Sequence, residues 1–294
     1  MRNSCRNDGL CAAIGAALLL LATPAGAEHH VKVHWSGDLG VGYDDNVGNA
    51  AEDNDLRDSS VVSGGVNLDY VRALSLYTAL LLRGGLQGEG YEAEGGLSNG
   101  RLVAMARLSH RPGGGFYMPT FAGWVSAGAL EFDSAMRDGF EFRGGLFMTE
   151  PLTTAISARL SVAASQRQSD STVFDLSAWS AGLNLDWAVT PGFTLYTGYQ
   201  FQDGDVVSTG TVPPKAMHIA GGCGSASACD PDDALDNQFA YRVDASTHIG
   251  TLGLNVPLSQ RMALDAQARR VDSSTDGGTS YERWQGGVSL LLRW

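Results

Sequence analysis

The chain has 294 residues, a formal net charge of −12 and only 18% charged residues, beside 38 Gly, six Trp, nine Tyr and ten Phe. The acidic balance argues against nucleic acid as a partner, because phosphates need clustered Lys and Arg. Lys occurs only as Lys32 and Lys215, so basic roles fall to Arg.

Residues 1–27 have the pattern of a cleaved signal peptide. Arg2 and Arg6 flank the start of the apolar run "LCAAIGAALLLLA", and "AGA" at 25–27 offers a cleavage site. The run is shorter than the roughly 20 residues that span a bilayer. We expect an exported chain whose mature part, 28–294, keeps 18 basic and 31 acidic residues, a balance of −13. Beyond it, the sequence contains no stretch long and apolar enough for a transmembrane helix.

From residue 31 onward the polarity alternates with a period of two. In "VKVHWSGDLGVGY" (31–43), Val33, Trp35 and Val41 share one face, and Lys32 and Asp38 share the other. This alternation is typical of a β-strand with one apolar face. It recurs at 64–70, 101–110, 138–148, 155–163, 179–187, 192–202, 237–250, 260–270 and 284–294.

The connections between these runs alternate between short and long. Short ones lie near 73 and at 111–115, 149–154, 189–193 and 256–260; longer polar ones lie at 44–60, 92–100, 133–139, 165–172, 204–236 and 272–280. We count about twelve strands, an even number. Short turns on one side and long loops on the other are typical of an up-and-down barrel in an outer membrane.

A soluble barrel or β-sandwich would alternate in the same way, with its apolar side chains inward. The signal peptide, the turn asymmetry and the C-terminal run "WQGGVSLLLRW" favour the membrane barrel. An open sheet edge in hydrocarbon would leave N–H and C=O groups unpaired, so the last strand must pair with the first. We therefore expect Trp294 to close the barrel beside 31–43.

The final strand resembles the C-terminal signature of Gram-negative outer-membrane β-barrel proteins, including porins. Val288, Leu290, Leu292 and Trp294 match its alternating apolar positions, with Trp in place of the commoner terminal Phe. The run "GVGYDDNVGNA" (40–50) also resembles the opening of porin-like barrels and of the barrel in surface-lipoprotein assembly modifiers, whose helical-repeat domain is missing here. The resemblance implies the outer membrane of a Gram-negative bacterium, with outer-membrane lipid, lipopolysaccharide and the barrel assembly machinery as partners.

If the apolar face contacts lipid, the polar face lines the lumen. Facing Arg toward hydrocarbon near the midplane would cost about 2–4 kcal/mol. Strand by strand, we expect these lumen-lining residues: Arg83, Arg107, Arg143, Arg159, Arg242, Asp244, His248, Asp265, Arg269 and Arg283. Their signs are mixed.

Two hypotheses follow for the lumen. Its charges could line a narrow channel for passive diffusion of small hydrophilic solutes, which they would select by a transverse field. They could instead pair and fill the lumen, leaving a closed structural or surface-interaction barrel that acts through its loops. Twelve strands are wide enough for a channel, and inner glycines such as Gly40, Gly65 and Gly85 leave space, which favours the channel.

The long loops carry acidic residues and two cysteines. The acidic residues, Asp44, Asp45, Glu52, Asp53, Asp55, Asp58, Asp230, Asp232, Asp233 and Asp236, lack EF-hand spacing. They could bind divalent cations, but solvated loops are favoured and no metal site is predicted. In an oxidising compartment, Cys223 and Cys229 favour a disulfide. A metal site there would need more ligands than His218, the one candidate nearby.

The sequence does not favour an enzyme. It has no G-x-S-x-G elbow, and His34 and His248 fit lumen positions better than a catalytic pair. An outer-membrane lipid hydrolase is the weakest hypothesis, and no cofactor is expected. The sequence therefore predicts an all-β, transmembrane, antiparallel up-and-down β-barrel of about 12 strands over 28–294, with small hydrophilic solutes as ligands.

Overall fold

The computed structural model describes residues 31–211, 226–236, 238–275 and 278–294. The predicted signal peptide, 1–27, lies outside the described residues. The strands of the barrel wall are β1 (Val31–Asp44), β2 (Ser59–Ala73), β3 (Thr78–Tyr91), β4 (Asn99–His110), β5 (Thr120–Phe132), β6 (Gly139–Pro151), β7 (Ile156–Ser169), β8 (Leu176–Thr190), β9 (Phe193–Gly210), β11 (Phe239–Pro257), β12 (Met262–Thr275) and β13 (Ser280–Arg293).

The remaining elements are short. β10 (Ala228–Pro231) pairs with β11 beyond the end of β12. Four 3-10 helices lie in connections: η1 (Asp53–Asp55), η2 (Gly95–Leu97), η3 (Ala135–Arg137) and η4 (Thr172–Phe174). In the described part of the chain, none of the helices has the length and apolar character needed to cross a membrane.

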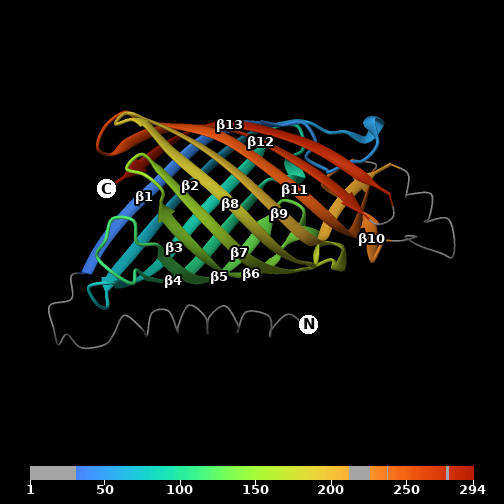
Figure 1. The fold of residues 1–294 in the computed structure, drawn as a ribbon. Coiled ribbons are helices and arrows are strands. Elements are labelled where there is room, and N and C mark those ends of the chain that lie inside the picture. Colours follow the sequence, from blue (N-terminus) through green and yellow to red (C-terminus); the bar gives the residue numbers. More distant parts are fainter. Residues whose placement is uncertain (1–30, 212–225, 237, 276–277) are drawn as a thin grey trace.

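The twelve wall strands form a closed antiparallel barrel (Figure 1). Each strand pairs with the next in chain order, β9 pairs with β11, and β13 returns to β1. At the closure, the backbone N–H of Trp294 donates to the carbonyl of Trp35 at 2.9 Å, and that of Trp35 donates back at 3.3 Å. The predicted twelve-stranded closed barrel is confirmed.

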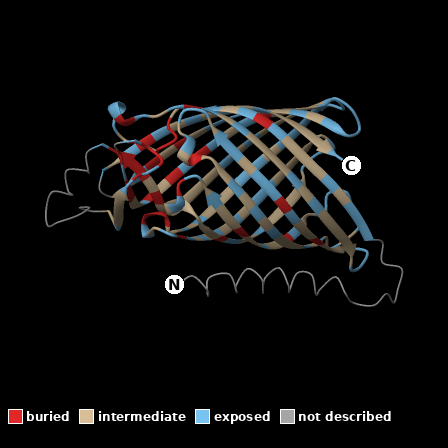
Figure 2. Ribbon diagram, turned by 180° about the vertical axis from the view of Figure 1, so that it is seen from behind, coloured by how far each residue is buried: buried red, intermediate tan, exposed pale blue. Residues whose placement is uncertain are grey.

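The two ends of the barrel differ. One, which we call the turn end, has the connections 74–77, 111–119, 152–155, 191–192 and 258–261, together with the start of β1 and the C-terminus. The other, the loop end, has the connections 45–58, 92–98, 133–138, 170–175 and 211–238, and that between β12 and β13. Buried residues gather at the loop end (Figure 2).

The outward face of the barrel is apolar. Leu39, Val125 and Leu252, on three separate strands, are 62%, 63% and 63% exposed. Outward Trp and Tyr side chains lie near both rims: Trp35, Trp187 and Trp294 toward the turn end, and Tyr43, Trp179 and Trp284 toward the loop end. Aromatic girdles that flank an apolar band mark the lipid-facing surface of membrane barrels.

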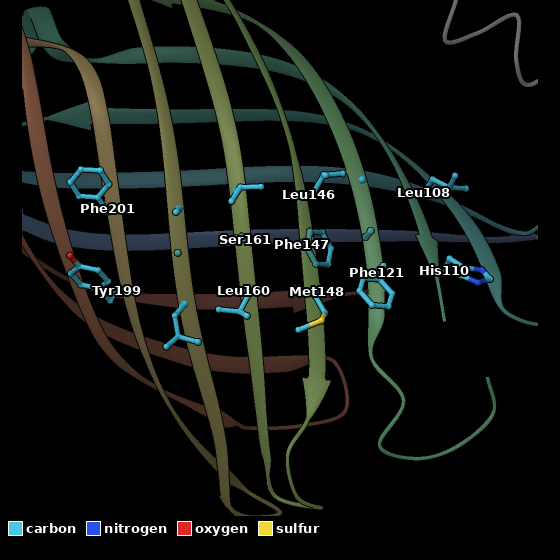
Figure 3. A pocket seen from close by; sticks show the side chains of 16 residues that line it. Leu108, His110, Phe121, Leu146, Phe147, Met148, Leu160, Ser161, Tyr199 and Phe201 are labelled. Atoms are coloured by element: carbon cyan, nitrogen blue, oxygen red, sulfur yellow. The ribbon is translucent and has the colours of Figure 1, made fainter. Parts of the chain in front are cut away.

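An open apolar hollow of about 780 Å³ lies on this face over β4 to β9. Leu108, Phe121, Leu146 and Leu160 surround it (Figure 3). Gly123 also lies in it, and its missing side chain adds to the depth. The hollow belongs to the outward face and opens away from the lumen.

Candidate functional site: the lumen and its loop cap

Seven of the residues predicted to line the lumen lie on the inner face. The strand register places Asp69 opposite Arg83 and Glu141 opposite Arg167, so charged residues of neighbouring strands share this face. The seven are Arg83, Arg107, Arg143, Arg159, Asp265, Arg269 and Arg283.

Three predicted lumen residues, Arg242, Asp244 and His248, lie instead on the outward face of β11. His248 pairs in register with Phe201 and Asp272; its Nδ1 lies 2.7 Å from the hydroxyl of Tyr199, which is 51% exposed. The lumen prediction for these three residues is therefore wrong.

The cause is an inverted pattern in the loop-end half of β11. There Ala245 and Ile249 point inward and pack in a buried cluster with Val206, Val271 and Tyr281. The polar side chains are left on the outward face, close to the loop end, where a polar surface is tolerated. Because the prediction assumed that apolar residues face outward throughout, it placed this stretch one residue out of phase.

A ring of charges surrounds the lumen on the turn-end side. Arg83 makes a two-pronged contact with Asp69, with Nε–Oδ1 and Nη2–Oδ2 distances of 2.6 and 2.7 Å. Arg107, on the neighbouring strand, lies within electrostatic range of both Arg83 and Arg159. The guanidinium of Arg159 sits 5.1 Å from the ring centre of Phe147.

The turn-side ring also contains two carboxylates, on β12 and β8. The hydroxyl of Tyr196 donates to Asp265 at 2.8 Å, and the amide of Asn255 donates to it at 3.1 Å. Asp186, the register neighbour of Tyr196, accepts at 3.5 Å from Ser157. Asp265 on β12 therefore lies away from Arg83 and Arg107 on β3 and β4, whereas Asp186 on β8 is beside Arg159 on the adjacent strand β7.

A second ring of charges lies nearer the loop end. Glu141 accepts from Arg101 and, at 2.6 Å, from Arg143. Across the barrel, Arg283 forms an ion pair with Asp44, which also accepts from Gln285 at 2.8 Å. This loop-side ring is paired more completely than the turn-side ring.

A polar chamber of about 420 Å³ lies between the two rings. Small and neutral polar residues wall it: Ser63, Ser161, Gly182, Asn184, Gly198, Gln200, Thr251, Gln267, Gly287 and Ser289. Arg269, Glu89 and Asp44 supply charge to its lining. A second cavity of about 300 Å³, which shares Glu89 and Tyr91 with the chamber, lies under the loops. Gly182, Gly198 and Gly287 help to leave this space unfilled, whereas Gly40, Gly65 and Gly85, named from the sequence, do not line it.

The loops form a packed cap over the loop end, built from 45–56, η2, η3, η4 and 228–236. Leu235 is fully buried and packs with Val47 and Leu97 of two other loops. Asp232, whose side chain is fully buried, pairs with Arg137, and the hydroxyl of Ser171 donates to Asp230 at 2.6 Å. Segment 228–236 therefore joins four loops.

The first loop is locked into the same cap. Asn46 donates through Nδ2 to the carbonyls of Ala50 and Glu282, each at 2.9 Å. Asn49 has a φ of 53°, a left-handed conformation that Asn adopts more readily than most residues, and it donates to Val207 at 2.9 Å. Arg283 donates to the Asn49 side chain at 3.0 Å, which ties the cap to the barrel wall.

Several acidic residues expected in solvated loops are buried. Asp44, Asp55 and Asp232 are 2%, 6% and 7% exposed. Each has partners that offset the loss of hydration: Arg283, Thr211 and Arg137, respectively.

One acidic group of the cap has a shifted pKa. Burial raises the pKa of Glu94 above its usual value, Asp236 and Asp232 raise it further, and Arg57 opposes them. Glu94 lies in the connection before η2. Its protonation is therefore coupled to the docking of segment 228–236.

Cys229 is disulfide-bonded. Its predicted partner, Cys223, lies outside the described residues. Within the described ranges, His, Cys, Asp and Glu side chains do not gather in a group of three or more that could hold a metal ion.

These features define an outer-membrane type of β-barrel with a polar lumen. Among solved structures, the chain is similar to the COG4313 outer membrane channel from Pseudomonas putida F1, with 14% identity and a TM-score of 0.58 over 92% of this chain and 100% of that one. It is also similar to the KdgM porin in complex with disordered oligogalacturonate (10% identity, TM-score 0.43, 86% and 97% covered) and to the NanC porin (7%, 0.45, 86% and 98%). No family model and no curated protein matches the chain. The likeness to the COG4313 channel confirms the predicted fold.

Proposed function

We propose that this chain is an outer-membrane channel for passive diffusion of small hydrophilic solutes. The chamber of about 420 Å³, walled by hydroxyls, amides and glycines between two charged rings, carries the proposal. A closed structural barrel has no need of such a space, because side chains can fill a narrow lumen. The fold shared with the COG4313 channel agrees with this function.

In the proposed orientation, the apolar outward face of the barrel forms a belt that contacts outer-membrane lipid. The turn end faces the periplasm, and the loop cap faces the outside of the cell. The cap narrows the outer entrance, so solutes pass beneath or beside segment 228–236. The chamber volume falls in the range of small-molecule sites, roughly 300–1,000 Å³. We therefore expect a small size limit.

The buried cap also supports a second candidate, a closed barrel that acts through its external loops. Leu235 and the Arg137–Asp232 pair hold the cap firmly enough to seal the mouth in that case. The two candidates differ in permeability.

Liposome swelling tests the proposal. Proteoliposomes with the refolded barrel should swell in monosaccharide solution and much more slowly in trisaccharide. Swelling no faster than that of protein-free liposomes, with a correctly folded barrel, would reject the channel and favour the closed barrel.

A further inference from the structure

The turn-side ring has Arg83 and Arg107 on the adjacent strands β3 and β4 with one bound carboxylate, Asp69, and Arg159 on β7, beside the strand of Asp186. Asp69 is held by Arg83 through two hydrogen bonds. Arg159 donates to the hydroxyl of Thr149 at 3.2 Å and lies over Phe147, so its charge is not matched by a carboxylate within ion-pair distance among the described residues. The part of the ring on β2, β3 and β4 therefore carries excess positive charge.

Arg107 lies between these groups, and its side chain has no hydrogen-bond partner among the described residues. Its Nε is shielded from solvent. Its register neighbours are Leu81 and Trp124, which offer no acceptor through their side chains. A guanidinium carries five donors in a fixed fork, and leaving such donors unpaired is costly. The Nε is closed to a solute, but Arg107 is only half-buried, so the two terminal NH2 groups of its guanidinium can take an acceptor from outside the chain.

The carboxylates of the ring favour Arg107 over its neighbours as the anion site. Asp69 is bound to Arg83, and Asp186 lies beside Arg159 on the adjacent strand β8. Asp265 is held by Tyr196 and Asn255 on β12, away from β3 and β4. An anionic group in the lumen is therefore attracted most strongly to Arg107, which has no carboxylate bound to it among the described residues.

We propose that Arg107, flanked by Arg83 and Arg159, binds the anionic group of a small oxyanion solute, a carboxylate or a phosphate. This inference rests on the proposed channel function and names a class of solute for it. Guanidinium groups match both oxyanions in a two-pronged geometry, so the site accepts either chemistry.

Single-channel recording tests the site, with inorganic phosphate and succinate titrated separately into a chloride solution. We expect a saturable decrease in conductance with at least one oxyanion. Arg107→Gln should weaken the apparent affinity by roughly tenfold or more, since hydrogen bonds to charged groups are lost. Arg270→Gln, on the outward face near the loop end, is the matched control and should leave the titration unchanged.

The two arms identify the solute chemistry. A response to phosphate alone assigns phosphorylated solutes, and a response to succinate alone assigns carboxylates. The absence of saturation with both, or an unchanged titration in Arg107→Gln, would overturn the inference while leaving the channel intact.

Calorimetry separates the inference from the proposed function. If the barrel proves silent in bilayers, the same two oxyanions are titrated into the refolded protein. Binding heat that Arg107→Gln removes and Arg270→Gln keeps would support the site without a channel. The absence of heat in the wild type would refute the site.

Discussion

The loop cap depends on Leu235, and its removal gives the most quantitative prediction. Leu235→Ala deletes a fully buried side chain that packs with Val47, Leu97 and Ala234. A buried Leu→Ala change costs about 2–5 kcal/mol, because transfer energy is lost and a cavity remains. This loss shifts the equilibrium between docked and undocked 228–236 by roughly 30- to 4000-fold.

Hydrogen exchange followed by mass spectrometry measures this shift directly, because local opening limits amide exchange in the docked segment. We expect faster exchange across 228–236 in Leu235→Ala, with little change in the central wall strands. In bilayers, the same variant should show more frequent or larger openings. The matched control is Leu252→Ala. The Leu252 side chain is 63% exposed on the outward face, so this substitution should leave both the exchange rates and the channel openings unchanged. Unchanged exchange in Leu235→Ala would refute the claim that this residue docks the cap.

Three further predictions concern charge, pH and closure. Asp69→Asn should shift the reversal potential toward anions, because the Arg83 wall loses a negative charge, and should lower stability by under about 1 kcal/mol, because the pair is partly exposed. Docking raises the pKa of Glu94, so the docked cap binds the proton more tightly than the undocked cap does. Lowering the pH through the raised pKa should therefore increase the protection of 228–236 relative to the intrinsic exchange rate at each pH, and Glu94→Gln should remove that increase. Deleting Trp294 removes two backbone hydrogen bonds to Trp35 and should lower the free energy of unfolding by about 1–3 kcal/mol. The heat-induced gel shift should then occur at a lower temperature. Trp294→Ala, which keeps the backbone hydrogen bonds, should lower the free energy of unfolding by less.

The barrel could be predicted from the sequence because the alternation is regular where lipid imposes it. Trp35 and Val41 share a face from the start of β1, and the C-terminal run keeps its phase to Trp294, so strand count and closure followed. Where the wall contacts lipid, the outward face of each strand must be apolar. Which residues of a strand point inward could therefore be read from the alternation of polar and apolar residues. Arg83, Arg107 and Arg159 were placed on the inner face for this reason.

Outside the belt the same rule fails. Near the loop end, the inner positions of β11 pack against other strands in a buried cluster, so Ala245 and Ile249 point inward while Arg242 and Asp244 point outward. The burial of Asp55 and Asp232 depends on partners far away in the chain, such as Thr211 and Arg137. A local pattern carries no information about contacts between loops, so the cap could not be predicted.

The open chamber inside the lumen is tested most directly by the single-channel conductance of a variant in which a large side chain fills it. Ser161 lines the chamber, whereas Val162, the next residue on β7, points outward and is 53% exposed. Wild type and Val162→Trp should show the same discrete conductance steps in a planar bilayer, and Ser161→Trp should show steps several-fold smaller. A silent wild-type barrel, or equal conductance in Ser161→Trp, would contradict the account.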